Sequence, residues 1–566
     1  MKTLQGIGAS SGFGHAKAFR LLPPHFSVDE ATTFQSSKEL PLLQTAIEQT
    51  TADLLRLEEV TTTNISPAAA EVFAAHQLIL LDPSMADYMQ ELIQQGHQAL
   101  YAVMQAQTFF KDMFASMDDA YMQERAQDIV DVTNRIATYV SGQVPIDLAL
   151  INEPVILIAR DLGPSDTAVL NKAFVRGFVT EIGGRTSHTA IIARSLEIPA
   201  VVGAVDALAS VNDQDIVLLN GTSGEVVVHP DVETLARFDQ ATKDYAKQQE
   251  ILQTYATKET RTKDGVRIEL ASNIGSIDEL DKAVERRSDG VGLFRTELLF
   301  LAASSAPTEE AQFEIYQRAV TLAQPHKIIF RTLDIGGDKV IPYMDLPKED
   351  NPFLGVRGIR LNLQERVLLQ TQLRALVRAS ATGPIRIMFP MIATLDELLD
   401  AKAMVEEAKT SLIADGSPVG EIEIGIMIEI PAAAVAADMF APHVDFFSIG
   451  TNDLIQYTMA ADRMNEGVKH LYQPYHPAVI RLISMTIDAA HRHGKWTGMC
   501  GSMAGELEAT TLLLALGLDE FSVSIASLLE LRAHIATIDT TALHGLKEAI
   551  LQATSQDQLM RILKQD

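Results

Sequence analysis

One histidine of this sequence stands where a phosphoryl acceptor would be expected. His188 follows a glycine pair at 183–184, and an amphipathic helical pattern begins beside it. Glycines let the backbone approach a phosphate closely, Ser187 can cap the helix, and the N–H groups and positive dipole end of a helix N-terminus favour an anion. His188 is therefore a candidate nucleophile. A histidine near a helix start can also be a capping or surface residue, so this stretch alone favours a phosphoryl-acceptor role for His188 only slightly.

The second half of the chain contains eight short apolar runs. They are 266–272, 290–296, 327–333, 385–391, 424–430, 445–451, 495–501 and 520–524. Helix-length segments separate the runs, which indicates parallel strands buried on both faces. Eight such strands over roughly 250 to 300 residues fit a (β/α)8 barrel. The alternative is an open doubly wound sheet.

Polar residues at the ends of these runs favour the barrel. They are Asn273, Arg295, Glu297, Arg331, Asp334, Glu429, Asn452, Asp453 and Cys500. In a closed parallel barrel the C-terminal strand ends converge on one face, which is where catalytic groups are found. Any one of these residues can be a solvated loop end. Polar residues scattered at random over a surface, however, would not fall so regularly at the C-terminal ends of the apolar runs.

Length and composition predict a cytoplasmic enzyme with several domains. A chain of 566 residues is too long for one core and predicts three or four folding units. Its single cysteine excludes an internal disulfide framework, and the N-terminus lacks the apolar core of a secretory signal. No run approaches the roughly 20 apolar residues of a membrane span. The net charge of −28 argues against nucleic acid as a partner and would steer a basic protein toward the chain.

Hydrophobic periodicity divides the first half of the chain. Helical patterns begin at Leu43 and continue over 71–81, 88–104 and 119–140, whereas strand patterns cover 155–159, 173–182, 200–203 and 215–228. We therefore expect an all-helical domain, 30–143, inserted into an α/β domain formed by 1–29 and 144–229. A helical linker, 230–258, then leads to the barrel, 259–566.

Five segments carry long sequence motifs. They are GRTSHTAI at 184–191, RTE at 295–297, RTLDIGGDK at 331–339, DFFSIGTNDL at 445–454 and GMCG at 498–501. In these motifs, and over essentially its whole length, the chain resembles Enzyme I of the bacterial sugar phosphotransferase system, the family of phosphoenolpyruvate–protein phosphotransferases. Departures from the family pattern fall mainly in loops, such as 301–305 and the stretch around Gly467.

The resemblance implies a set of binding residues. It places phosphoenolpyruvate against Arg295, Arg331, Asn452, Asp453, Arg463, Arg357 and Lys339, and it makes Glu429 and Asp453 the ligands of Mg²⁺. The residue chemistry agrees, because arginine can clamp a phosphate bidentately and Mg²⁺ normally takes one or two carboxylates beside substrate and water. For each arginine the alternative role is a salt bridge on the barrel rim. That alternative is strongest for Arg357 and Lys339.

By resemblance, His188 attacks the phosphoryl group of phosphoenolpyruvate in line through Nε2. Positioning and charge neutralisation carry most of such a reaction. The departing enolate must take a proton on carbon to become pyruvate, and Cys500 could donate it. Without the resemblance, a lone buried cysteine would be read as a small hydrophobic residue.

The resemblance also implies a protein partner and a homodimer. The recipient of the phosphoryl group is the histidine phosphocarrier protein, which would dock on the helical domain through Glu71, His76 and apolar neighbours such as Leu78 and Leu81. His188 must then visit two sites, so we expect the α/β domain to swivel on hinges near 143–147 and 228–260. Dimerisation is expected through the barrel.

Two other functions fit the sequence less well. A pyruvate-phosphate dikinase or phosphoenolpyruvate synthase needs a large nucleotide-binding domain, for which this chain has no remaining residues. A non-catalytic protein that senses phosphoenolpyruvate would be expected to have lost Cys500, Glu429 or Asp453, and all three are present. We also expect no additional N-terminal sensory domain of the kind carried by the nitrogen-linked paralogue.

Overall fold

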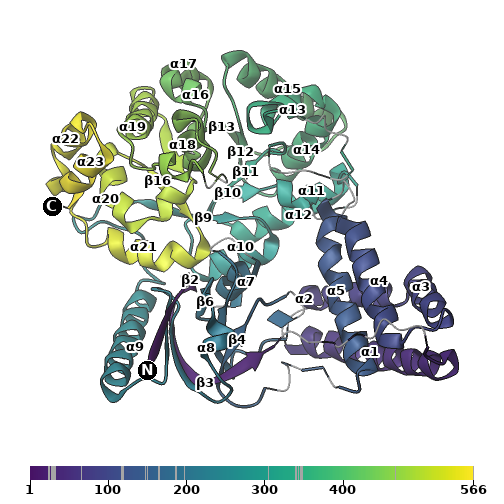
Figure 1. The fold of residues 1–566 in the computed structure, drawn as a ribbon. Coiled ribbons are helices and arrows are strands. Elements are labelled where there is room, and N and C mark those ends of the chain that lie inside the picture. Colours follow the sequence, from purple (N-terminus) through teal and green to yellow (C-terminus); the bar gives the residue numbers. More distant parts are fainter. Residues whose placement is uncertain are drawn as a thin grey trace. The chain divides into compact units, whose positions relative to one another are not determined.

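The protein is described by a computed structural model and consists of two compact units, Met1–Gln248 and Gln249–Asp566. The structure describes residues 1–564 apart from 23–25, 27, 29–32, 65–66, 116–119, 144, 147, 149–150, 164–165, 168, 185–187, 197, 302, 304, 338–340, 342, 345–348, 464 and 466. Figure 1 labels the helices and strands of both units.

The first unit contains a mixed sheet in the order β1-β8-β7-β3-β4-β5-β6-β2. Its strands are β1 (Lys2–Gln5), β2 (Ile7–Ser10), β3 (Phe13–Leu21), β4 (Val155–Ala159), β5 (Val175–Thr180), β6 (Ala200–Val202), β7 (Ile216–Asn220) and β8 (Glu225–Val228). Strands β3 to β6 are parallel neighbours. The strand predicted over 215–228 is two antiparallel strands instead, because the chain reverses before Gly224, whose φ is 79° and whose N–H donates to Asn220 O.

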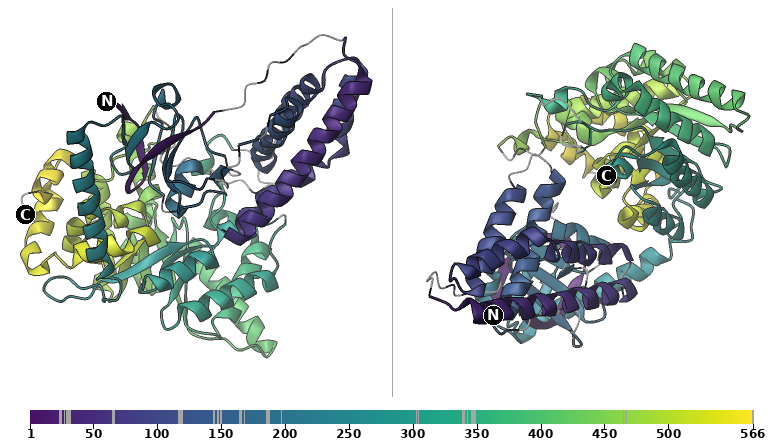
Figure 2. Two further views of the ribbon diagram at one scale, coloured as in Figure 1. Left: turned by 90° about the horizontal axis from the view of Figure 1, so that it is seen from below. Right: turned by 90° about the vertical axis from the view of Figure 1, so that its right-hand side faces the viewer.

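Helices fill the interval between β3 and β4, as the insertion hypothesis expects (Figure 2). They are α1 (Ser36–Asn64), α2 (Pro67–Leu80), α3 (Pro83–Gln94), α4 (Ala99–Ala115) and α5 (Ala120–Val140). The single helix predicted over 88–104 is wrong. Gly96 adopts a φ of 97°, and the N–H of His97 donates to Leu92 O, so the chain leaves the helix there and α4 begins a new one.

Two further helices lie at positions that the sequence analysis singles out. The short α7 (His188–Leu196) begins at the predicted acceptor histidine. The long α9 (Val232–Gln253) lies where the helical linker is predicted, and the boundary between the two units falls within it.

The second unit contains a closed parallel barrel, which confirms the fold class predicted from the eight runs and excludes the open sheet. Its strands are β9 (Glu269–Ile274), β10 (Val291–Arg295), β11 (Ile328–Arg331), β12 (Ile385–Phe389), β13 (Ile422–Ile428), β14 (Phe446–Ile449), β15 (Trp496–Met499) and β16 (Glu520–Val523). Each pairs in parallel with its neighbours, and β16 closes the ring onto β9.

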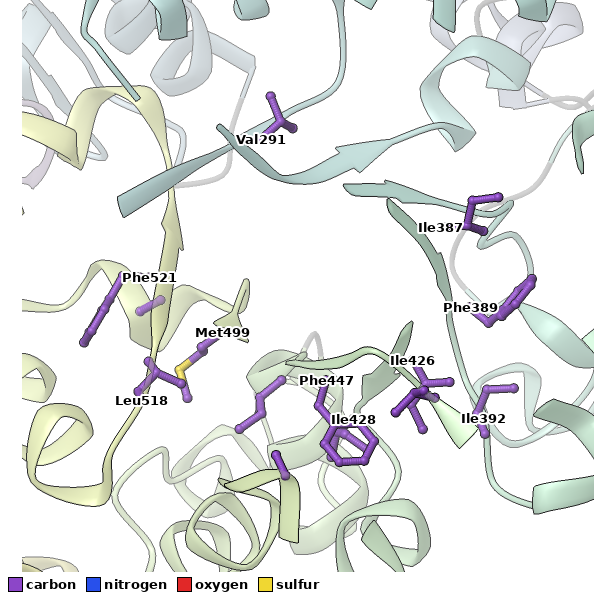
Figure 3. Packing of buried hydrophobic residues seen from close by; sticks show 14 of the residues in the cluster. Val291, Ile387, Phe389, Ile392, Ile426, Ile428, Phe447, Met499, Leu518 and Phe521 are labelled. Carbon is purple, nitrogen blue, oxygen red and sulfur yellow. The ribbon is translucent and has the colours of Figure 1, made fainter. Parts of the chain in front are cut away.

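Helices surround the barrel. They include α10 (Ile277–Glu285), α11 (Glu297–Leu301), α12 (Glu309–Ala323), α13 (Ile359–Gln364), α14 (Arg366–Ala379), α15 (Leu395–Ala414), α16 (Pro431–Val435), α17 (Ala437–Phe440), α18 (Thr451–Met459), α19 (Pro477–Arg492), α20 (Leu507–Leu516), α21 (Leu528–Ile535), α22 (Leu546–Gln552) and α23 (Gln556–Leu563). One large apolar cluster joins helices and strands, and Figure 3 shows its members arranged around the ring of strands.

Alternation along the strands separates two apolar layers. On β12, Ile385, Ile387 and Phe389 belong to the large cluster beneath the helices, while the intervening Met388 joins a second, smaller cluster. That second cluster also contains Leu293, Ile329, Met427, Phe446 and Cys500 and fills the barrel interior. Two-residue periodicity therefore places Arg331 after Ile329 and Glu429 after Met427 on the inward face.

The N-terminal end of the barrel holds a buried acid, Glu520. Its carboxylate lies 3.8 Å from the guanidinium of Arg386, which itself lies 4.4 Å from the ring centroid of Trp496. A Cβ atom on Gly292 or Gly498 would come within 2.7 Å of Glu520 Oε1. These two glycines therefore make the space that the acid occupies.

Among the helices that the structure describes, none combines the length and the apolar character that crossing a membrane requires.

Candidate active site

The C-terminal end of the barrel is organised around two buried arginines. Arg331 ends β11, where its Nη2 donates to Glu297 Oε1 at 2.5 Å and its Nη1 lies 2.9 Å from Asp334 Oδ2. All three side chains are almost fully buried. Paired in this way, the Arg331 guanidinium is held in one orientation at the mouth of the barrel.

Arg357 bridges two aspartates at the same end of the barrel. Its Nε donates to Asp334 Oδ1 at 3.2 Å, and its Nη1 donates to Asp453 Oδ1 at 3.0 Å. A further bond reaches the hydroxyl of Tyr457 at 3.4 Å. Because only 2% of Arg357 is exposed, its guanidinium is committed to the protein. This arrangement favours a supporting role for Arg357 over direct contact with a substrate.

Glu429 follows β13 and is 1% exposed. Its Oε1 accepts a bond of 2.6 Å from the N–H of Met391. Burial, followed by the charges of Asp453 and Asp334, raises the pKa of Glu429 to about 8. A carboxylate whose pKa is raised by neighbouring carboxylates marks a site that a divalent cation would stabilise, and carboxylate oxygens are the ligands that Mg²⁺ prefers.

Cys500 follows β15 and lies inside the mouth of the barrel. Its thiol is buried, with Sγ 3.8 Å from the carbonyl oxygen of Ile449. Burial raises the pKa of Cys500 to about 11. The thiol is therefore protonated at neutral pH, which suits a proton donor and not a thiolate nucleophile.

Other polar groups at this end remain available. Arg295 ends β10 beside Arg331 in the register of the strands, is exposed, and has no carboxylate partner among the described residues. Asn452 Oδ1 accepts bonds from the backbone N–H and the hydroxyl of Ser502. That orientation leaves the amide of Asn452 to donate. Asn273 is instead used internally, since its Nδ2 donates to the carbonyl oxygens of Cys500 and Ser522.

The structure thus brings together Arg295, Arg331, Arg357, Glu429, Asn452, Asp453 and Cys500 at one end of the second unit. Arg463 follows α18, where its backbone N–H donates to Gln456 Oε1. Lys339 lies outside the described residues, as do Arg185, Thr186 and Ser187 of the histidine motif. The backbone of His188 begins α7 in the first unit, and its side chain is not among those described.

Sequence reasoning missed the structural partners of the arginines. In the sequence, Glu297 and Asp334 are strand-end acids to which no role is assigned, and Tyr457 lies outside the motifs. A usable signal exists for the tyrosine, because it follows Asp453 by four residues and therefore shares its face of α18. No signal in the sequence pairs Glu297 with Arg331, since 34 residues separate them.

One expected docking residue of the helical insertion is wrong. His76 is 1% exposed, and its Nε2 lies 3.3 Å from Asp128 Oδ1, so this histidine ties α2 to α5 and presents no surface to a partner. Leu78 and Leu81 do fit the expectation, with exposed fractions of 73% and 66%. The side chain of Glu71 lies outside the described set.

Buried arginines, paired carboxylates, a protonated thiol and an exposed arginine form a site suited to a small polyanion. Arginines and a cation would neutralise phosphate and carboxylate charge, while the thiol could protonate a carbanion or enolate.

Known proteins match the whole chain. Models of the PEP-utilising enzymes match in three parts: the N-terminal domain over residues 5–125, the mobile domain over 151–224 and the PEP-binding domain over 249–540. A phosphoenolpyruvate-protein phosphotransferase of Geobacillus stearothermophilus is 48% identical over 565 residues, covering 100% of this chain and 98% of the relative. One of Listeria innocua is 47% identical, covering 100% and 99%. A solution structure of Enzyme I (nEIt) is 36% identical with a TM-score of 0.40, covering 43% of this chain and 99% of its own.

Proposed function

Because this chain belongs to the phosphoenolpyruvate–protein phosphotransferase family, we propose that it phosphorylates its own His188 and then passes the phosphoryl group to a histidine phosphocarrier protein. Its activity is phosphoenolpyruvate-dependent phosphoryl transfer in the phosphotransferase system. A purely regulatory role is not favoured.

The observation that carries the proposal is the joint placement of Arg331, Glu429 and Cys500 on inward positions at one end of the barrel. Phosphoenolpyruvate carries a phosphate and a carboxylate, so its binding requires several cationic groups. Arg295 is exposed, has no carboxylate partner among the residues that the structure describes, and supplies one phosphate contact. Arg331 is held rigid by Glu297 and Asp334 and supplies a preorganised one. Asn452 donates through its free amide, and Lys339 and Arg463 are assigned further substrate contacts.

Arg357 acts through its neighbours. Its guanidinium holds Asp334 and Asp453 in place, so it is a positioning residue in this scheme. Asp453 thereby presents fixed oxygens to the substrate and the metal.

Enzymes of this family use a metal cofactor, and we propose Mg²⁺ held by Glu429 and Asp453. The residues fit such an ion, because both are buried carboxylates whose charges repel each other. When bound, the cation would neutralise charge on the transferring phosphoryl group.

Cys500 is assigned the proton that converts the enolate to pyruvate. The thiol is protonated at neutral pH because its burial raises its pKa, and it lies on the inward face at the end of β15. The P–O bond of phosphoenolpyruvate breaks as a P–N bond forms on His188. The S–H bond of Cys500 then breaks as a C–H bond forms on the enolate, and solvent water returns a proton to the thiolate.

The central experiment is to incubate the full chain with labelled phosphoenolpyruvate and Mg²⁺ and to map acid-labile phosphate. We expect the label on His188 of the wild type. The variant His188→Ala should carry no label and should form no pyruvate. Label that persists in this variant at another histidine would refute the assignment. Circular dichroism of the variant checks that the fold is intact.

Docking on the helical insertion is assigned to its exposed apolar residues Leu78 and Leu81 with surrounding acidic charge. A carrier with a basic patch would then associate more slowly as salt rises, since screening shortens to about 10 Å at 0.1 M. Swivelling of the phosphohistidine domain, a homodimer through the barrel and a cytoplasmic location complete the proposal.

A further inference from the structure

A cavity of about 360 Å³ opens beside the N-terminal end of the barrel, within the second unit. Its apolar floor is formed by Leu280, Ala283, Val291 and Ala323, each of which is less than 5% exposed. Its rim carries the basic side chains of Lys258, Arg267, Arg287 and His326. The cavity is at the opposite strand ends from Arg331, Glu429 and Cys500, so it is separate from the candidate active site.

Most of the basic groups on this rim have no acidic partner. Glu259 lies 2.7 Å from Arg261, and Asp289 is 3.8 Å from Arg267. Within the described part of the chain, no carboxylate pairs with Lys258 or Arg287, and no side chain bonds the His326 ring. These three groups share one cavity in a chain whose net charge is −28. Lys258 Nζ does lie 4.3 Å from the centroid of the Tyr255 ring, a contact that leaves its charge uncompensated by any carboxylate that the structure describes. Such a concentration of basic groups without carboxylate partners favours an anionic ligand.

The cavity also borders two chain segments that the side chain of Arg532 links by hydrogen bonds. Arg532 is 1% exposed and donates through Nη1 to Tyr255 O at 3.1 Å and through Nη2 to Arg287 O at 2.6 Å. It thereby joins the segment after α9 to the turn after α10. Burial lowers the pKa of Arg532, the charge of Asp289 opposes that shift, and the charge of Arg287 adds to it. An anion beside Arg287 would offset that repulsion.

We propose that this cavity binds a small organic phosphate as an effector. Lys258 and Arg287 would contact the phosphate, His326 would donate a ring N–H to it, and the apolar floor would receive a short carbon skeleton. Guanidinium matches phosphate geometry bidentately, and the cavity volume is at the small end of the range for ligand sites. Binding would hold the segment 255–260 against the turn at 286–288, which is where the chain enters the barrel.

Hydrogen exchange of the full chain, with glycerol 3-phosphate as the probe, tests the proposal. The probe should protect amides in 255–260 and 284–291 of the wild type. In Lys258→Gln/Arg287→Gln the half-saturating concentration for this protection should rise at least about tenfold, because two charge-assisted contacts are lost. The matched control is Lys263→Gln/Arg492→Gln, which removes one lysine and one arginine that are exposed and outside the cavity.

The outcomes separate the two sites. Protection confined to the strand ends around 295–297 and 331–334 means that the probe binds only at the active site, and this overturns the proposal. Equal protection of the double variant and its control also overturns it, as does no protection anywhere. If Arg287→Gln disturbs folding, the single variant Lys258→Gln gives the same test at an exposed position. Phosphorylation of His188 without the probe should be unchanged in all of these variants.

Discussion

Replacing Glu520 by glutamine should flatten the pH dependence of barrel stability. Burial, followed by the charge of Glu269, raises the pKa of Glu520 to about 8. Its Oε1 has no hydrogen-bond partner among the residues that the structure describes. The carboxyl therefore keeps its proton in the folded barrel at neutral pH, whereas the unfolded chain releases it.

The sign follows from proton binding. Between the unfolded pKa of about 4.3 and the folded value, the native state binds more protons than the unfolded state, so stability falls as pH rises. The steepest slope is about 1.4 kcal/mol per pH unit. Integration between about pH 6 and about pH 8 gives a loss of about 2 kcal/mol in the free energy of unfolding. The side chain at position 520 cannot titrate in Glu520→Gln. The free energy of unfolding of this variant should therefore fall by about 2 kcal/mol less than that of the wild type over the same pH interval.

Urea unfolding followed by tryptophan fluorescence measures this directly. Trp496 is the one tryptophan of the chain, and it stacks on Phe446 with ring centroids 4.8 Å apart. The signal therefore reports on the barrel and not on the first unit. Unfolding curves at several pH values, analysed by linear extrapolation, give the free energy for each protein.

The control is Glu530→Gln, which makes the same charge change at an exposed position of α21. It should retain the pH slope of the wild type. Parallel pH profiles for wild type and Glu520→Gln would refute the reasoning, because they would mean that Glu520 is already ionised in the folded barrel.

Four further expectations concern other parts of the chain. Cys500→Ala should still bind phosphoenolpyruvate but form pyruvate roughly 10² to 10⁴-fold more slowly; a near wild-type rate in a coupled pyruvate assay would leave Cys500 a packing residue. Arg357→Met should destabilise the barrel by about 3 to 5 kcal/mol, because buried Asp453 loses its arginine partner and buried Asp334 keeps only Arg331. A cost below about 1 kcal/mol in urea unfolding would contradict this. Gly96→Ala should cost about 1 to 2 kcal/mol in circular dichroism melts, since its φ is 97°; an unchanged midpoint would mean that the turn relaxes. Fragment 1–258 should exchange phosphate with phosphorylated carrier but should not react with phosphoenolpyruvate, whereas fragment 259–566 should bind phosphoenolpyruvate. Phosphorylation of fragment 1–258 by phosphoenolpyruvate alone would refute the placement of the substrate site.

The barrel was predictable because its signal is local. Each strand is a short apolar run, and the next inward residue after the run, such as Arg331 or Glu429, is polar. Strand closure brings these separate ends together by topology alone, so no side-chain detail was required. The same reasoning applies to β4, whose five residues are all apolar and buried.

The parts that could not be predicted depend on contacts distant in sequence or on single backbone angles. Helical periodicity continues smoothly across 88–104, and only the left-handed conformation of Gly96 breaks it. The family resemblance predicts His76 at a docking surface, whereas its actual environment depends on Asp128 of α5. The commitment of Arg357 to two aspartates likewise cannot be read from spacing, because 96 residues separate it from Asp453.

The topology of the first unit bears on how the chain folds during synthesis. Strand β1 pairs with β8, so Lys2 has Val228 as its register partner. The first strand to leave the ribosome, β1, must therefore wait without a partner strand until more than two hundred residues have followed. Loop closure over that distance costs only about 2 kcal/mol more than closure over about 20 residues, so the equilibrium cost is modest. The consequence is a delay in folding. Helices α1 to α5 make local contacts and can form during this delay. We therefore expect the nascent N-terminal strands to be the segment that a chaperone would need to shield.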